Sequence, residues 1–150
     1  MRHDLCNDAR HLYAARRFYE GHCYGLLAEE RNLPATAIAA HEDFTRSTAR
    51  ADLVSLIEAD VRLHRELIGA LANPYIGSAH SLLINETRLC LAQIQHRHLL
   101  DPTIINEEHS RILHAIQTGN PAQARQYGTD HLVNAEIRLV EHLAEVSAKT

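Results

Sequence analysis

The spacing of apolar residues constrains this chain most, because it follows a helical period from one end to the other. Apolar side chains recur three or four residues apart, which is the pattern of a helix with one buried face. Short turn signals interrupt the pattern, and neither an alternating strand pattern nor an internal repeat stands out. We therefore expect helices over about residues 5–31, 35–48, 51–74 and 75–98, followed by two that begin near residues 101 and 120.

The turn residues support this division. Asp101-Pro102 and Asn120-Pro121 each place a capping side chain before a proline at the first helical position. Gly119 suits the left-handed residue that ends a helix. Short loops between helices make sequence neighbours pack side by side, so the sequence predicts an all-α antiparallel helical bundle of about six helices.

Composition narrows the classes of function. A chain of 150 residues with 45% hydrophobic content can bury a real core, and we expect one domain over residues 1–150. The net charge of −4, without a dense Lys/Arg stretch, offers no footprint for nucleic acid. Three cysteines without Cys-x-x-Cys spacing, a charged N-terminus and the lack of an apolar run of ~20 residues indicate a soluble cytoplasmic protein.

Histidine is unusually frequent, with twelve in the chain, and one lies in the stretch DVRLH inside an apolar run. Asp60 and His64 of this stretch are four residues apart, so a helix presents them on the same face. The ordinary interpretation is an exposed Asp60 and a half-buried His64. The alternative is that both residues are ligands of one metal ion.

Two further histidines lie at a matching height along their helices. His109 and His131 are each about ten residues from the turn at 119–120, or about 15 Å along the helix, so they face each other across a hairpin. His64 lies about 14 Å from the turn at 73–74. In an up-down bundle these two turns are at the same end. All three histidines and the aspartate of DVRLH could therefore converge inside the bundle.

The other histidines do not pass this geometric test. His114 lies about 140° round the helix from His109, and His142 lies about 16 Å from His131, too far to share an ion. We interpret these two and most of the rest as surface or packing residues: His3, His11, His41, His80, His96, His98, His114 and His142. His22 remains undecided.

Three neutral imidazoles and one carboxylate suit a divalent metal ion, with zinc as the first choice and nickel, manganese or iron as alternatives. Burial of these groups without an ion would leave polar atoms in need of partners. Four protein ligands complete a tetrahedron, or leave two positions open in an octahedral ion. A small chelating acid would occupy such open positions.

Three segments of the chain carry a resemblance to a known family. They are ARRFYEGHCYGLLAEER with its Arg16 and Tyr19-Glu20, DVRLHRELIGALANP, and NEEHSRILHAIQTGNPAQARQYGTDHL. Together they resemble the FCD domain, the C-terminal effector domain of GntR-superfamily transcription factors of the FadR type. The resemblance covers nearly the whole chain. One departure is Leu63, which stands where the family usually has phenylalanine.

The resemblance implies a fold, a metal and a ligand. Many members of the family bind a divalent metal through one aspartate and three histidines, which here fall on Asp60, His64, His109 and His131. Their bundle cavity binds small organic acids, and such domains commonly form homodimers. The family's N-terminal winged-helix domain is not part of this sequence, so DNA contact would depend on a separate domain.

Four residues are candidates for ligand contact. Arg16 and Glu20 lie one helical turn apart, and Arg16 could clamp a carboxylate, although a surface salt bridge between the two is equally compatible with the spacing. Arg88 is a second candidate anion clamp, with a solvated arginine as the alternative. Asn134 follows His131 by one turn and could add a polar contact or be a bystander.

Two functions remain open from the sequence. In the first, a ligand at the metal stabilises one arrangement of the bundle and would reposition DNA-binding domains in a complete regulator. In the second, a stand-alone metalloenzyme acts on a small carboxylate-bearing metabolite, with Glu20 or His22 as acid or base. A bundle with a purely structural ion is a third reading. No nucleophile elbow, phosphate loop or HExxH motif supports the enzyme.

Overall fold

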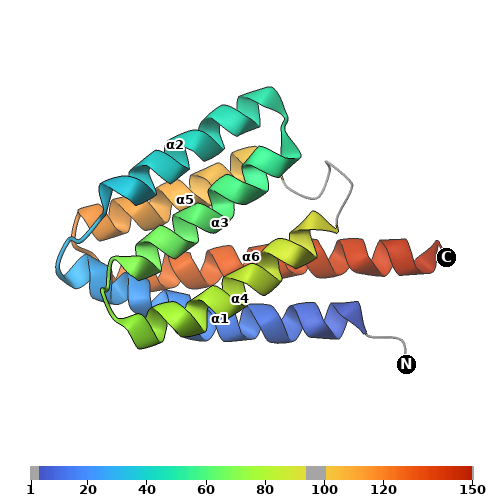
Figure 1. Cartoon of the computed structure of the whole chain (residues 1–150), viewed down its shortest axis with the longest axis horizontal. Helices are drawn as coiled ribbons and strands as arrows, with labels where there is room; N and C mark the ends of the chain where they lie inside the picture. Colours follow the sequence, from blue (N-terminus) through green and yellow to red (C-terminus); the bar gives the residue numbers. More distant parts are fainter. Residues whose placement is uncertain (1–3, 94–100, 150) are drawn as a thin grey trace.

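Residues 4–93 and 101–149 are described by the computed structural model, and six α-helices account for most of them (Figure 1). They are α1 (Leu5–Glu29), α2 (Ala35–Arg50), α3 (Leu53–Gly69), α4 (Pro74–Ala92), α5 (Pro102–Gln117) and α6 (Pro121–Ala148). The all-α fold predicted from the periodicity is confirmed. None of the helices in these two ranges is long and apolar enough to cross a membrane.

The caps explain where several helices begin and end. The Asp101 side chain accepts hydrogen bonds from two first-turn amides of α5, and the Asn120 side chain accepts one from the first turn of α6. Gly119, between the two helices, has a φ of 73°, a conformation that suits glycine. Asn73 likewise caps α4, so Asn73-Pro74 starts a helix rather than closing α3, which already ends at Gly69.

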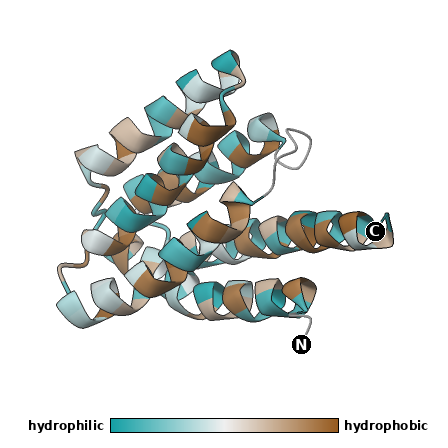
Figure 2. Ribbon diagram, turned by 45° about the vertical axis from the view of Figure 1, so that its right-hand side comes forward, coloured by the Kyte–Doolittle hydropathy of each residue, from teal (hydrophilic) through white to brown (hydrophobic). Residues whose placement is uncertain are grey.

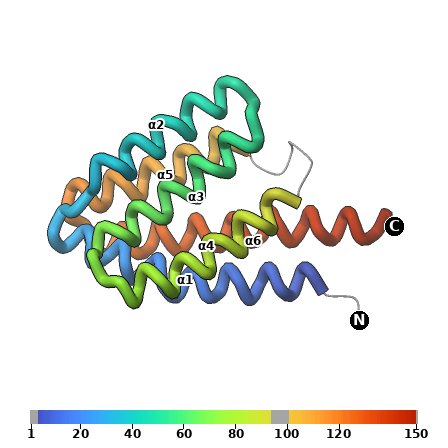
Figure 3. Tube along the Cα trace, in the orientation of Figure 1, coloured from blue at the N-terminus to red at the C-terminus, as the bar shows by residue number. Residues whose placement is uncertain are grey.

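Helices α1 and α6 are the two longest and pack against each other most extensively, running antiparallel (Figures 1 and 3). Helix α2 packs on α3, which also contacts α4, while α5 packs on α6. Figure 3 shows α3 and α5 running in the same direction, as the up-down arrangement requires. A Cβ atom at Gly128 would lie 2.6 Å from the Tyr24 ring, so the α1–α6 contact depends on that glycine.

Two larger apolar clusters and a smaller third one fill the bundle. Figure 2 shows hydrophobic and hydrophilic residues alternating along the helices. The first cluster includes Leu27, Leu63, Leu67, Ile112 and Ile116. The second cluster includes Tyr13, Ile57, Ile84, Leu132 and Leu139. Along α1 and α6, buried polar side chains lie between the segments that supply the two larger clusters, and on α3 buried His64 lies next to the boundary between them. The candidate site lies in this polar layer.

Candidate metal centre

An aspartate and three histidines meet in the polar layer, and their ligand atoms all lie within 4.8 Å of one another. This Asp–His cluster consists of Asp60 and His64 on α3, His109 on α5 and His131 on α6. The Nε2 atoms of His64 and His131 are 3.3 Å apart. Asp60 Oδ1 lies 3.0 Å from His109 Nε2 and 3.5 Å from His64 Nε2. The structure thus brings all four predicted residues together.

Three of the six separations between the ligand atoms are close to those expected around a shared metal ion, and all six are within 4.8 Å. Imidazole nitrogens and carboxylate oxygens bind zinc at about 2.0–2.2 Å, which places neighbouring ligands about 3.3–3.5 Å apart in a tetrahedron. The three separations given above run from 3.0 to 3.5 Å. The donor set, three imidazoles and one carboxylate, is also one that divalent zinc, nickel, manganese or iron accepts. The residues therefore fit the metal that the resemblance implies.

His109 shows why the cluster needs a further partner. Its side chain is fully buried, and neither ring nitrogen makes a hydrogen bond to any described residue. The 3.0 Å approach of Nε2 to Asp60 lacks hydrogen-bond geometry. Burial lowers the pKa of His109, while the neighbouring Asp60 carboxylate opposes that shift. A buried neutral imidazole with unpaired nitrogens is costly unless an ion takes a lone pair.

Burial and neighbouring charges set the protonation of the cluster. Burial would raise the pKa of Asp60, but His64 and His109 hold it well below its usual range. Burial would lower the pKa of His64, but Glu20 and Asp60 raise it to about 9. Burial lowers the pKa of His131 to about 4. The cluster thus holds an anionic carboxylate whose charge is balanced by a protonated His64, and a metal ion would replace that proton.

Glu20 on α1 lies behind His64. Its side chain is fully buried and receives two hydrogen bonds from Arg16, at 2.7 and 3.1 Å. The Tyr24 hydroxyl donates to Glu20 Oε1 at 3.0 Å and lies 2.7 Å from His64 Nδ1, which is itself 3.0 Å from Glu20 Oε1. His80 Nε2, from α4, lies 3.3 Å from the same oxygen. Burial would raise the pKa of Glu20, but Arg16 and His64 hold it well below its usual range.

Glu108 on α5 lies beside Nδ1 of His131, as Glu20 lies beside Nδ1 of His64. Its Oε1 atom lies 2.8 Å from His131 Nδ1. Arg138 donates to Glu108 at 2.9 and 3.4 Å, and Asn134 donates to Oε2 at 3.0 Å. Burial would raise the pKa of Glu108, but hydrogen bonds from His131 and Arg138 lower it to about 2. Asn134 therefore supports Glu108, and it does not line the cavity described next.

A small cavity of about 30 Å³ adjoins the Asp–His cluster. Asp60 and His131 of the cluster form part of its wall, with Arg16 and Arg138 as the two cationic side chains. The rest of the lining is largely apolar and comes from all six helices: Tyr13, Phe44, Ile57, Leu91, Ile105, Ala135 and Leu139. The cavity thus combines metal ligands and two guanidinium groups with an apolar wall.

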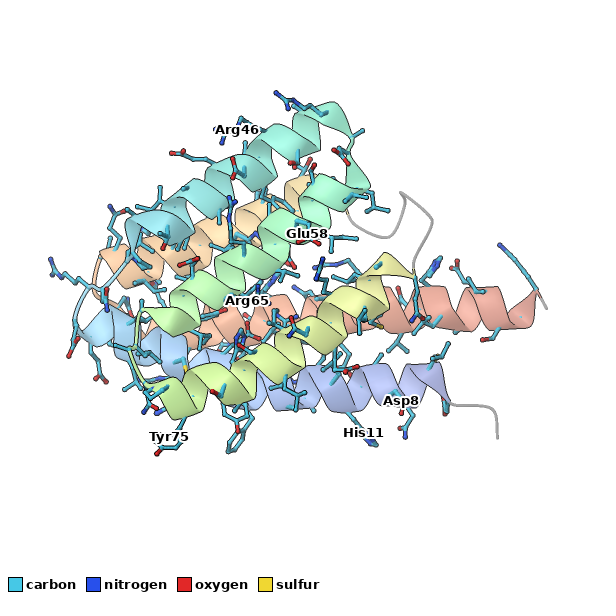
Figure 4. The ribbon with its side chains drawn as sticks, in the orientation of Figure 1. Asp8, His11, Arg46, Glu58, Arg65 and Tyr75 are labelled. Carbon is cyan, nitrogen blue, oxygen red and sulfur yellow. The ribbon has the colours of Figure 1, made fainter. Side chains whose placement is uncertain are left out.

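The two arginines that the sequence analysis gave as candidate anion clamps, Arg16 and Arg88, differ in burial. Arg16 is 2% exposed and paired with Glu20 inside the bundle, so this pair is no surface salt bridge. Arg88 is 52% exposed and pairs with Glu58 at 2.6 Å on the outer face. Arg88 does not line the cavity, so the structure does not bring this candidate to the site. Figure 4 labels Glu58 on α3 among the surface side chains.

The other histidines that the structure describes do not join the cluster. His80 is buried beside Glu20, and His41 is half-buried with its Nε2 atom 3.1 Å from Ser110 Oγ. His22 is exposed, which leaves it outside the site. Three others lie outside the described residues: His3, His96 and His98.

Arg138 and Glu108 are site residues that the sequence reasoning missed. Arg138 follows His131 by seven residues, two helical turns on the same face, and that spacing could have identified it. Glu108 precedes His109 by one residue but pairs with His131 on the next helix. No local spacing predicts such a pair, because it depends on how α5 and α6 pack.

Fold and site together define a class, an all-α bundle with a buried histidine–aspartate cluster beside a small cavity. The family model of the FCD domain matches residues 11–134, and the chain belongs to the FCD domain family. Its fold is similar to the metal-free FCD domain of TM0439, a proposed transcriptional regulator, with a TM-score of 0.77 at 20% identity. That match covers 93% of this chain and 96% of the other. Among curated proteins, no sequence matches.

Proposed function

We propose that this chain is the metal-dependent effector-binding domain of a GntR/FadR-type transcriptional regulator, and that its effector is a small organic acid. The observation that carries the proposal is that Asp60 and His131 belong both to the Asp–His cluster and to the cavity wall. An acid in the cavity would meet a metal held by the cluster at one end. Zinc is the preferred ion, with nickel, manganese or iron as alternatives.

The chain's own residues supply the rest of the binding site. Arg16 and Arg138 present guanidinium groups to the cavity, and guanidinium is the side chain best suited to a carboxylate. The apolar wall suits the carbon skeleton of the acid. The metal, when bound, supplies a Lewis-acidic position for a carboxylate oxygen.

The size of the cavity supports a conformational response. A volume of about 30 Å³ holds about two water molecules, since one needs roughly 10–15 Å³. An organic acid of several carbons therefore requires a more open arrangement of the helices. Such an acid would stabilise that arrangement by its differential affinity, which is how a ligand shifts a two-state equilibrium. In a cytoplasmic regulator the shift would be passed to a DNA-binding domain.

Metal analysis of the purified protein, followed by thermal unfolding with carboxylic acids, tests the proposal. We expect about one divalent ion per chain, and a rise in melting temperature with an acid that the chelator EDTA abolishes. His109→Ala should remove both effects, because His109 is in the cluster but does not line the cavity. Arg138→Ala should keep the ion and lose the response to the acid. An acid response that is unchanged after EDTA would contradict the proposal.

The domain is also proposed to form a homodimer, as the resemblance implies. Helix α4 exposes three large apolar side chains spaced seven residues apart, Tyr75, Leu82 and Leu89, which are 87%, 67% and 57% exposed. Seven-residue spacing places them on one face, where two copies of α4 could pack. Tyr75 points away from the bundle in Figure 4. Light scattering should give a dimer for the wild type and a monomer for Leu82→Glu; a wild-type monomer would refute this part.

The comparisons lend no support to the alternative of a stand-alone metalloenzyme. His22, one of the two residues considered as acid or base, is exposed and outside the site. Glu20, the other, is enclosed by Arg16 and Tyr24 and is not part of the cavity wall. Recovery of the stabilising acid unchanged after incubation is the result expected of a sensor, whereas its turnover would favour the enzyme.

A further inference from the structure

Two carboxylates lie directly behind the histidines of the Asp–His cluster, and they carry an inference about how the metal ligands are prepared. We infer that Glu20 and Glu108 are positioning residues: they hold the proton of His64 and of His131 on Nδ1, so that both Nε2 atoms can bind the metal. The inference rests on the proposed metal centre and names two of its outer partners.

The first chain of contacts runs from Arg16 through Glu20 to His64. Arg16 donates both of its hydrogen bonds to Glu20, which identifies this buried carboxylate as ionised and therefore able only to accept. The Tyr24 hydroxyl must then donate its proton to Glu20 Oε1, 3.0 Å away. Its oxygen is left as an acceptor 2.7 Å from His64 Nδ1. Nδ1 must supply the hydrogen of that contact.

The second chain runs from Arg138 through Glu108 to His131 and needs no intermediary. Glu108 Oε1 lies 2.8 Å from His131 Nδ1, and Arg138 and Asn134 occupy its remaining acceptor positions. A carboxylate that accepts from two other donors can only accept from the imidazole as well. Nδ1 of His131 is again the protonated nitrogen.

The protons on Nδ1 determine that the opposite nitrogen of each ring, Nε2, is free to bind a metal ion. A neutral imidazole carries one proton, so a proton on Nδ1 leaves a lone pair on Nε2. The two Nε2 atoms are 3.3 Å apart and face the same point. Carboxylates that bond to the far nitrogen of a histidine ligand orient the ring and increase its basicity, and their loss typically costs 10–100-fold in metal affinity.

His109 provides an internal control. Its Nδ1 atom is buried and has no hydrogen-bond partner among the described residues. The two outer carboxylates therefore serve two of the three imidazoles. A change at Glu20 or Glu108 should be felt by one histidine each and not by His109.

The tautomers are measured by ¹⁵N NMR of the imidazole side chains in zinc-free protein at a pH above about 9, where His64 also becomes neutral, with signals assigned from single histidine variants. We expect a proton on Nδ1 of both His64 and His131 in the wild type. In Glu108→Gln the amide NH₂ can donate to Nδ1, which should move the proton of His131 to Nε2. In Glu20→Gln the amide can donate to Tyr24, whose hydroxyl then donates to His64, with the same result there.

Zinc affinity, measured by competition with a chelator, gives the second readout. Each variant should bind zinc about 10–100-fold more weakly, whereas Glu58→Gln, a surface carboxylate paired with Arg88, should bind as the wild type does. Arg138, the arginine left without a carboxylate in Glu108→Gln, is 21% exposed, whereas Arg16 is 2% exposed, so Glu108→Gln should fold even if Glu20→Gln does not. In that case the wild-type spectrum of His64 decides the role of Glu20.

An unprotonated Nδ1 on either histidine of the wild type, or unchanged tautomers and zinc affinity in the variants, would overturn the inference. Failure of the proposed function gives a different result. If zinc does not bind but the Nδ1 protons are present and respond to the variants, the positioning role stands and the metal centre falls.

Discussion

Arg16–Glu20 and Arg88–Glu58 join the same two side-chain types in two regions of the molecule, yet they lie in opposite environments. Inside the bundle, Arg16 and Glu20 are 2% and 0% exposed, and Glu20 also contacts Tyr24 and His64. On the surface, Arg88 and Glu58 are 52% and 51% exposed. Water screens the surface pair, whereas the buried pair depends entirely on its protein partners.

The comparison shows that burial, rather than residue type, determines how strongly the loss of one partner of a charged pair destabilises the protein. A buried ion pair contributes little net stability when intact, because desolvation offsets the Coulomb attraction. Removal of one partner is costly, since it leaves the other charge buried and unpaired. The interior pair is therefore a constraint on the fold, and the polar layer built on it can hold a precise arrangement of histidines.

Glu20→Ala should lower the stability of the protein more than any other change considered for these two pairs. It leaves the Arg16 guanidinium uncompensated inside the bundle, and we expect a loss of about 3–5 kcal/mol in the free energy of unfolding. Urea denaturation followed by circular dichroism measures the loss. The double variant Arg16→Met/Glu20→Leu removes both charges and should recover most of the stability. A loss below about 1 kcal/mol in the single variant would mean that the pair behaves as a surface pair does.

Zinc should stabilise the protein through the interior region, and the surface pair should make no contribution to this effect. At a free concentration 100 times its Kd, zinc should raise the free energy of unfolding by about 2.7 kcal/mol. The increase should be the same in Arg88→Ala, because Arg88 is on the surface, and it should vanish in Asp60→Asn, which weakens a ligand. Differential scanning calorimetry with and without EDTA measures it. Equal stabilisation of Asp60→Asn would place the zinc elsewhere.

Gly128→Ala tests the packing that holds the interior partners. The added Cβ would lie 2.6 Å from the ring of Tyr24, the residue between Glu20 and His64, and overpacking of this kind typically costs about 1–3 kcal/mol. The matched control is Gly77→Ala, where nothing lies within 4 Å of the new Cβ. That helical substitution should instead stabilise the protein by about 0.4–1 kcal/mol. Thermal unfolding of the two variants gives the signs, and equal signs would contradict the close contact.

Glu58→Ala should have the smallest effect. Its partner Arg88 remains solvated when the pair is broken, so the free energy of unfolding should fall by less than about 1 kcal/mol. Raising the ionic strength should reduce the difference further, because salt screens exposed charges. Chemical denaturation at low and high salt measures both quantities. A loss as large as that of Glu20→Ala would erase the distinction between the two regions.

Much of the site was accessible from spacing alone. The distances of His64, His109 and His131 from their nearest turns predicted a common level, because a helix rises by a constant amount per residue. The partners of the cluster were less accessible. Glu108 and Arg138 act through contacts between α5 and α6. For Arg88 the spacing allowed both an anion clamp and a solvated arginine, and the structure shows it exposed. Spacing gives the height of a residue along a helix, but not which neighbouring helix its side chain meets.

By itself, the amino-acid sequence predicted the six helices that the structure describes, the caps that begin the last two of them, and the level at which the metal-type ligands lie. These follow from local rules, since caps, prolines and apolar periodicity act within a few residues. Only the tertiary structure decided that Arg16 is buried while Arg88 is solvated, and that Glu20 and Glu108 lie behind His64 and His131. Those outcomes depend on the rotation and packing of whole helices, and burial sets the energy of a charge far more than its place in the chain does.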